Sequence, residues 1–209
     1  MIDKEYFINR ICNELGIENH RLKLFSIFLY GSRVYNNYTD ESDYDFIVVR
    51  RQLDYKVDSV KTKDGVINCT IYSPQGFQKA IDEHEISVLE CLSLSEELVI
   101  LNNKEWNVKI DLNQLRSSIS QKSSNSWVKA KKKLNDDEDY IAQKSLFHSM
   151  RMILFGKQLA LYNKIIDFEE ANYLWYEIQE LDFEWSIWKE KYQQFRNNLL
   201  SEFRLIAPK

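Results

Sequence analysis

The sequence of 209 residues has few glycines, prolines and cysteines, and no long apolar run. Five glycines and two prolines allow few tight turns, so the composition predicts long helices. The three cysteines, Cys12, Cys69 and Cys91, have no metal-ligand or redox-motif spacing, which indicates reduced core thiols. Met1–Glu5 does not open a basic stretch followed by apolar residues, and no window has the length of a membrane span. We therefore expect a cytoplasmic protein without a signal peptide.

The chain also lacks a strong charge of either sign. Its formal net charge is -4, which argues against a generally basic nucleic-acid binder but leaves room for a local basic patch. Hydrophobic residues make up 44% of the chain, enough to form a packed core and to exclude a disordered chain.

The first half of the chain mixes strand-like and helix-like patterns, which predicts an α/β domain over residues 1–110. Expected helices begin after Asp3 and at Ser73-Pro74, where a capping side chain precedes the helical pattern. The full set of expected elements is a helix over Asp3–Leu15, strands over Leu24–Tyr30 and Phe46–Val49, a hairpin of Tyr55–Lys61 with Gly65–Tyr72, helices over Ser73–His84 and Ile86–Leu94, and a strand over Leu98–Leu101.

From about Asp111 the strand-like runs disappear and long amphipathic patterns follow, which predicts a helical bundle over residues 111–209. One helix is expected over Asp137–Tyr162, and another from a capping-box-like Asp167 and Glu170 to Glu180. The last helix carries an aromatic stripe that is either core or an oligomer face, formed by Trp185, Trp188, Tyr192 and Phe195.

The segment Phe28–Val49 organises the first half. An apolar strand leads into a Gly31-Ser32 turn, and Asp43 and Asp45 open a second apolar strand. Residues i and i+2 of a strand project from the same face, so the two carboxylates point the same way. They would repel each other unless a cation lies between them, which makes a metal site the favoured interpretation.

Gly31-Ser32, ten intervening residues and Asp43-Tyr-Asp45 on a strand resemble the signature of the polymerase-β-type nucleotidyltransferase superfamily. The resemblance implies an α+β, nucleotidyltransferase-like mixed sheet with flanking helices, followed by a helical bundle. It further resembles the subfamily associated with RNA repair, in Tyr30–Tyr35, Glu41–Asp45, Val88–Leu92 and Lys144–Arg151.

The resemblance implies that Asp43 and Asp45 hold two magnesium ions, with manganese as an alternative, and that Gly31 and Ser32 bind the phosphates of a nucleoside triphosphate such as ATP. Arg33 either reaches a phosphate or is an ordinary surface arginine.

Three further residues, Lys144, His148 and Arg151, share one helical face. They form either a cationic strip that faces the triphosphate across a cleft or a solvated helix face.

The third carboxylate of the superfamily is missing from its expected position. In the strand Val66–Tyr72 the best-aligned residue is Asn68, whose amide carries no charge and cannot accept a proton. Asp64 or Glu90 could substitute for it.

The resulting hypothesis is a magnesium-dependent nucleotidyltransferase that moves a nucleoside monophosphate to a hydroxyl, with RNA as the expected acceptor and a protein or small molecule as alternatives. A catalytically weakened nucleotide- or partner-binding module is the competing hypothesis.

Overall fold

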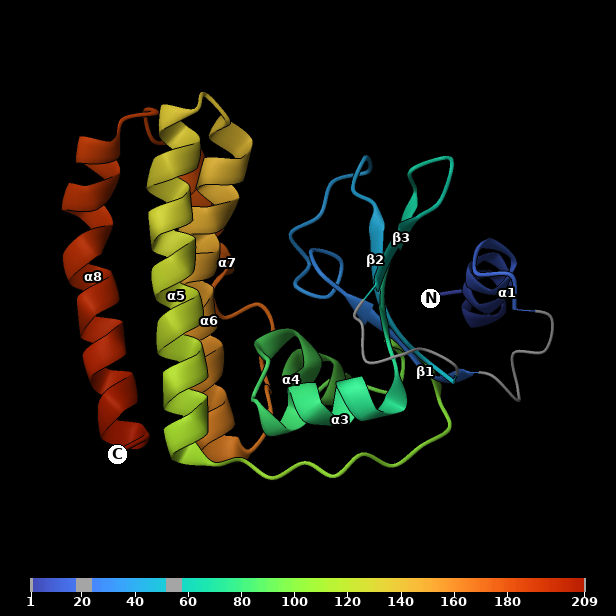
Figure 1. Cartoon of the computed structure of the whole chain (residues 1–209). Coiled ribbons are helices and arrows are strands. Elements are labelled where there is room, and N and C mark those ends of the chain that lie inside the picture. Colours follow the sequence, from blue (N-terminus) through green and yellow to red (C-terminus); the bar gives the residue numbers. More distant parts are fainter. Residues whose placement is uncertain (1, 18–23, 52–57, 209) are drawn as a thin grey trace. The chain divides into compact units, whose positions relative to one another are not determined.

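The computed structural model describes residues 2–17, 24–51 and 58–208, and the chain divides into two compact units, Met1–Lys109 and Ile110–Lys209 (Figure 1). Within its described residues, unit 1 forms a five-stranded sheet in the order β3-β4-β2-β1-β5. The pair β2–β4 is parallel and the other pairs are antiparallel. The strands are β1 (Leu24–Tyr30), β2 (Tyr44–Arg50), β3 (Asp58–Lys61), β4 (Ile67–Tyr72) and β5 (Val99–Asn102).

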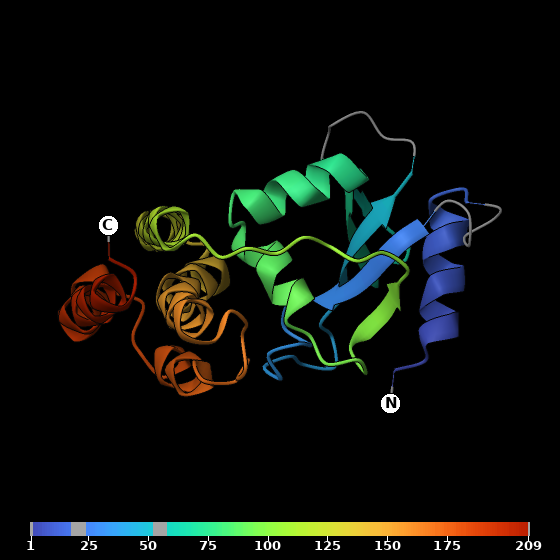
Figure 2. The ribbon, with the colours of Figure 1, turned by 90° about the horizontal axis from the view of Figure 1, so that it is seen from below.

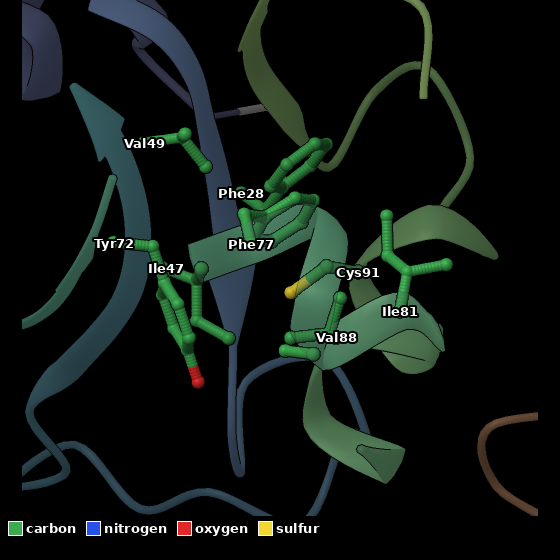
Figure 3. Close-up of a cluster of buried hydrophobic side chains, with 9 residues drawn as sticks. Phe28, Ile47, Val49, Tyr72, Phe77, Ile81, Val88 and Cys91 are labelled. Carbon is green, nitrogen blue, oxygen red and sulfur yellow. The ribbon is translucent and has the colours of Figure 1, made fainter. Parts of the chain in front are cut away.

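Helices cover both faces of the sheet, with α1 (Lys4–Glu14) on one face and α3 (Pro74–Asp82) and α4 (Ile86–Leu92) on the other (Figure 2). On the first face, the ring of Phe7 lies 5.0 Å from that of Phe46. On the second face, Phe28 stacks on Phe77 with ring centroids 5.8 Å apart. Figure 3 shows this second core, in which strand residues meet α3 and α4.

Alternation along β2 fixes the face on which Asp45 lies. Ile47 and Val49 belong to the core under α3 and α4, whereas Phe46 faces α1. Because Asp45 has the same parity as Ile47 and Val49, its side chain projects toward the α3–α4 face at the start of the strand.

Unit 2 is a helical bundle with α6 at its centre. Helix α6 packs against each of its three neighbours, and α5 also contacts α8. The bundle consists of α5 (Leu112–Asn135), α6 (Asp139–Tyr162), α7 (Asn172–Gln179) and α8 (Trp185–Ile206). Trp188 and Tyr192 are buried, so these members of the aromatic stripe belong to the core of the bundle.

The fold class predicted from the sequence, a mixed sheet with flanking helices followed by a helical bundle, is confirmed. Residues 55–57 of the expected hairpin lie outside the described part of the chain. Among the described helices, none is both long and apolar enough to cross a membrane.

The expected helix from Asp167 begins later than predicted, at Asn172. The side chain of Gln158 on α6 holds the preceding segment in a non-helical form. Its Oε1 accepts hydrogen bonds from the amides of Ile166 and Asp167 at 2.7 and 2.9 Å, and its Nε2 donates to Glu170 Oε2 at 2.6 Å. This competing network joins residues 8 to 12 positions apart, beyond the reach of local capping rules, which therefore do not predict it.

At Gly156 the helix α6 packs closely against Ile119 and Phe203, and replacement of this glycine by alanine is expected to destabilise the bundle. A Cβ at this position would lie 2.9 Å from Ile119 Cγ1 and 3.2 Å from Phe203 Cζ. Relieving this overlap should lower the free energy of unfolding by about 1–3 kcal/mol. Urea unfolding measures the change, and Asn125→Ala on the exposed face of α5 is the control, with an expected effect within about 0.5 kcal/mol.

Candidate active site

The Gly31 turn rests directly on the Asp45 carboxylate. Strand β1 ends at Tyr30, and Gly31 follows with φ +83°, a conformation that side-chain-bearing residues rarely adopt. A Cβ on Gly31 would lie only 2.6 Å from Asp45 Oδ2. The turn continues with a hydrogen bond from the amide of Val34 to the Gly31 carbonyl at 2.9 Å. Position 31 therefore requires glycine for its backbone angle and for the space beside the carboxylate.

Asp45 and Asn68 are neighbours across the sheet. Asp45 pairs with Tyr30 in the antiparallel β1–β2 register and with Asn68 in the parallel β2–β4 register. Asn68 Nδ2 donates a hydrogen bond to Asp45 Oδ1 at 3.0 Å. Asn68, which the sequence alignment placed at the position of the superfamily's third carboxylate, is thus in contact with Asp45.

Neither alternative acid completes a group of three with the two aspartates. In the described residues, no set of three or more Asp, Glu, His or Cys side chains is arranged to hold a metal ion. Asp64 accepts hydrogen bonds from Thr62 Oγ1 at 2.6 Å and from the Val66 amide at 3.1 Å, and it forms an ion pair with Arg10. These contacts hold the pKa of the Asp64 carboxyl well below its usual range, the hydrogen bond from Thr62 contributing most.

Glu90, the other alternative acid, is buried in α4 and accepts a hydrogen bond from the buried Tyr35 hydroxyl. Tyr35 lies in the turn segment that begins at Gly31. The contact therefore anchors this segment to α4.

Arg33 holds the backbone of Ser42 and Asp43, at the point where the chain enters β2. Its Nε donates to the Asp43 carbonyl at 3.2 Å and its Nη2 to the Ser42 carbonyl at 2.5 Å. The guanidinium also lies over the rings of Tyr44 and Tyr38, at 3.8 and 4.7 Å from their centroids. In this structure Arg33 thus fixes the segment that carries Asp43, a role that the sequence interpretation missed although two tyrosines flank the segment.

Lys61 is a second residue that the sequence interpretation missed. Its Nζ lies 3.7 Å from Asp43 Oδ2, and both side chains are partly exposed to solvent. Lys61 is also the cross-strand partner of Asn68 in the β3–β4 register. The hairpin expected from the sequence, Tyr55–Lys61 with Gly65–Tyr72, could have identified Lys61. Its register determines which residue of the first strand lies opposite Asn68.

Lys144, His148 and Arg151 all lie on α6 in unit 2, whereas Gly31, Ser32 and the two aspartates lie in unit 1. Arg151 is buried beside the rings of Phe147 and Phe155. Burial, and then the charge of Arg151, holds the pKa of His148 well below its usual range, so this imidazole is neutral at pH 7. Lys144 is half-buried with its ammonium 4.9 Å from the Tyr140 ring centroid. A phosphate-binding role for the three stays a prediction.

The chain is thus an α+β protein in which a glycine turn contacts Asp45 at the start of a central strand, two residues after Asp43. No family model matches the chain, and no curated protein matches it.

Among solved structures, the chain is similar to a nucleotidyltransferase-like protein from Exiguobacterium sibiricum 255-15, with 13% identity and a TM-score of 0.37 over 97% of this chain and 76% of that chain. It is also similar to the spectinomycin adenyltransferase AAD(9) from Enterococcus faecialis, with 15% identity and a TM-score of 0.48 over 96% of this chain and 99% of that chain.

Proposed function

We propose that this chain is a magnesium-dependent nucleotidyltransferase that moves a nucleoside monophosphate from a nucleoside triphosphate to a hydroxyl. The observation that carries the proposal is the contact between the Gly31 turn and Asp45, where a Cβ would come within 2.6 Å of Oδ2. A turn without a side chain can pack closely against the carboxylate, which brings the backbone amides of the turn next to a metal-ligating oxygen. In this proposal residues 1–110 form the nucleotidyltransferase domain and residues 111–209 a helical domain.

The residues at the start of β2 fit a magnesium ion. Asp43 and Asp45 offer carboxylate oxygens, the ligands that this hard cation prefers. Gly31 allows the turn to approach Asp45 Oδ2 more closely than a residue with a Cβ could. When bound there, magnesium would activate the attacking hydroxyl and neutralise charge on the pyrophosphate that leaves.

The protein's own groups bind the triphosphate and orient the two aspartates. The Ser32 hydroxyl and the amides of the turn are hydrogen-bond donors for the triphosphate. Arg33 fixes Asp43 through the Ser42 and Asp43 carbonyls, and Asn68 fixes Asp45 through its amide. Two positioned carboxylates and a donor-rich turn are the parts that phosphoryl transfer requires, because its catalysis is mainly positioning and electrostatic stabilisation.

The acceptor is proposed to be RNA, with a protein or small-molecule hydroxyl as the alternative. A basic run on α5 could contact an RNA backbone. However, Lys133 of this run is paired with Asp136 and Glu138, which weakens its field. The three other members, Lys129, Lys131 and Lys132, are exposed.

A second candidate function, nucleotide binding without turnover, is favoured by Asn68. An amide beside Asp45 can orient the carboxylate but cannot take the proton of the attacking hydroxyl. Nucleotide binding is then retained while the rate of transfer is low.

A label-transfer assay tests the first function. The protein is incubated with magnesium, total RNA and each of the four α-labelled nucleoside triphosphates. We expect transfer of label from at least one of them. Asp43→Ala combined with Asp45→Ala should reduce transfer about 100-fold or more, because the cation that binds the triphosphate loses its carboxylate ligands.

The matched control is Asp40→Ala combined with Glu41→Ala. Both residues are exposed and precede Asp43 by only two or three positions, so this variant makes the same change in net charge. It should transfer label at the wild-type rate. Equal activity of the two double variants would contradict the proposal, and nucleotide binding without any transfer would favour the second candidate.

A further inference from the structure

A row of four side chains crosses the sheet at the end where β2 begins. Tyr30 pairs with Asp45, Asp45 with Asn68, and Asn68 with Lys61, through three consecutive strand registers. Residues paired directly across strands project from the same face, with strands about 4.8 Å apart. Lys61, on the edge strand β3, therefore extends over the same face as Asp45.

The side chain of Lys61 reaches Asp43, one of the two carboxylates proposed to bind the metal ion. Its Nζ lies 3.7 Å from Asp43 Oδ2. The backbone register supports this placement independently of the side-chain contact. Strands β3 and β4 pair over Asp58–Lys61, which puts Lys61 opposite Asn68. The ammonium group thus adds a positive charge to the proposed catalytic centre.

The net charge of the site indicates a role for the Lys61 ammonium group. The third carboxylate is replaced by the neutral Asn68, and in the described residues no further acid joins Asp43 and Asp45. Two carboxylates offset one divalent cation, whereas two such ions would leave an excess of positive charge. One divalent ion and one ammonium group together leave a single positive charge for the triphosphate.

We propose that Lys61 contacts the triphosphate and takes the place of a second metal ion, so that the site holds one divalent cation. This inference rests on the proposed nucleotidyltransferase function. The Lys61 side chain is 59% exposed and that of Asp43 38% exposed, and an ion pair this exposed contributes little to folding. Lys61 can therefore exchange the carboxylate for a phosphate at little cost when a nucleotide binds.

Binding measurements on Lys61→Met test the inference. Electron paramagnetic resonance counts bound Mn²⁺, and isothermal titration calorimetry measures binding of each of the four nucleoside triphosphates. We expect one Mn²⁺ per wild-type chain without nucleotide. In Lys61→Met the affinity for Mn²⁺ should rise about three- to tenfold, because a repelling charge is removed. The affinity for the nucleotide should fall about tenfold.

Lys63→Met is the matched control, because Lys63 is exposed, lies two residues away and carries the same charge. Both affinities should change less than about twofold in this variant, whereas Lys61→Arg should retain nucleotide binding. If the wild type binds nucleotide but Lys61→Met behaves like Lys63→Met, or if two Mn²⁺ ions bind, the inference alone fails. If the wild type binds neither Mn²⁺ nor any of the nucleotides, the proposed function fails and the inference falls with it.

Discussion

Gly31→Ala is expected to reduce label transfer about 100-fold and to weaken nucleotide binding. Gly31 has φ +83°, where a residue with a Cβ is strained by about 1–2 kcal/mol. The added Cβ would also lie 2.6 Å from Asp45 Oδ2 and 3.3 Å from Asp45 Cβ, so either the turn or the carboxylate must move. A displacement of about 1 Å at a reacting centre reduces a rate about 100-fold. Label transfer, nucleotide calorimetry and urea unfolding measure the three consequences.

Gly16→Ala separates the strain from the contact. Gly16 also has a positive φ, +61°, but a Cβ there would meet nothing within 4 Å. This variant should lose about 1 kcal/mol of stability from the backbone alone and retain nucleotide binding. Gly31→Ala should show both losses. If the two variants bind nucleotide equally well, the close contact between the Gly31 turn and Asp45 is not needed for nucleotide binding.

Local patterns were sufficient to predict the centre of the sheet. Strand β1 spans Leu24–Tyr30 as expected, and β2 extends the expected Phe46–Val49 to Tyr44–Arg50. Both are apolar runs that are buried on two faces, where composition and length identify a strand. The resemblance aligned Asn68 with the third carboxylate of the superfamily, and the parallel pairing of β2 with β4 places this residue beside Asp45.

The surroundings of the aspartates depended on contacts between distant parts of the chain. From the sequence, Arg33 was either a phosphate ligand or an ordinary surface arginine. In the structure, the direction of its side chain is set by the rings of Tyr38 and Tyr44 and by two backbone carbonyls. Lys61 comes close to Asp43 only because β4 lies between β3 and β2. Strand order and the direction of long side chains are tertiary properties, which neither spacing nor propensity encodes.

Asn68→Asp is expected to make the protein depend on a divalent cation for its stability. The wild-type amide donates to Asp45 Oδ1 at 3.0 Å. An ionised carboxylate in its place can only accept, so the variant loses a hydrogen bond to a charged group and gains repulsion between two acids. Without metal, the free energy of unfolding should fall by about 2–3 kcal/mol.

A divalent cation should reverse that loss, because three carboxylates bind it more tightly than two carboxylates and an amide. Saturation at about 100 times the dissociation constant adds about 2.7 kcal/mol of stability, enough to cancel the cost of the substitution. Thermal unfolding with EDTA and with magnesium measures the difference. We expect a large increase in melting temperature with magnesium for Asn68→Asp and a smaller one for the wild type.

Asn103→Asp is the control for the added charge, because Asn103 is exposed in unit 1 and follows β5. Its response to magnesium should equal that of the wild type. If Asn68→Asp behaves in the same way, Asp45 is not a metal ligand. If it instead gains magnesium-dependent stability together with faster label transfer, the missing third carboxylate limits the rate of the natural sequence, and the two candidate functions differ by one side chain.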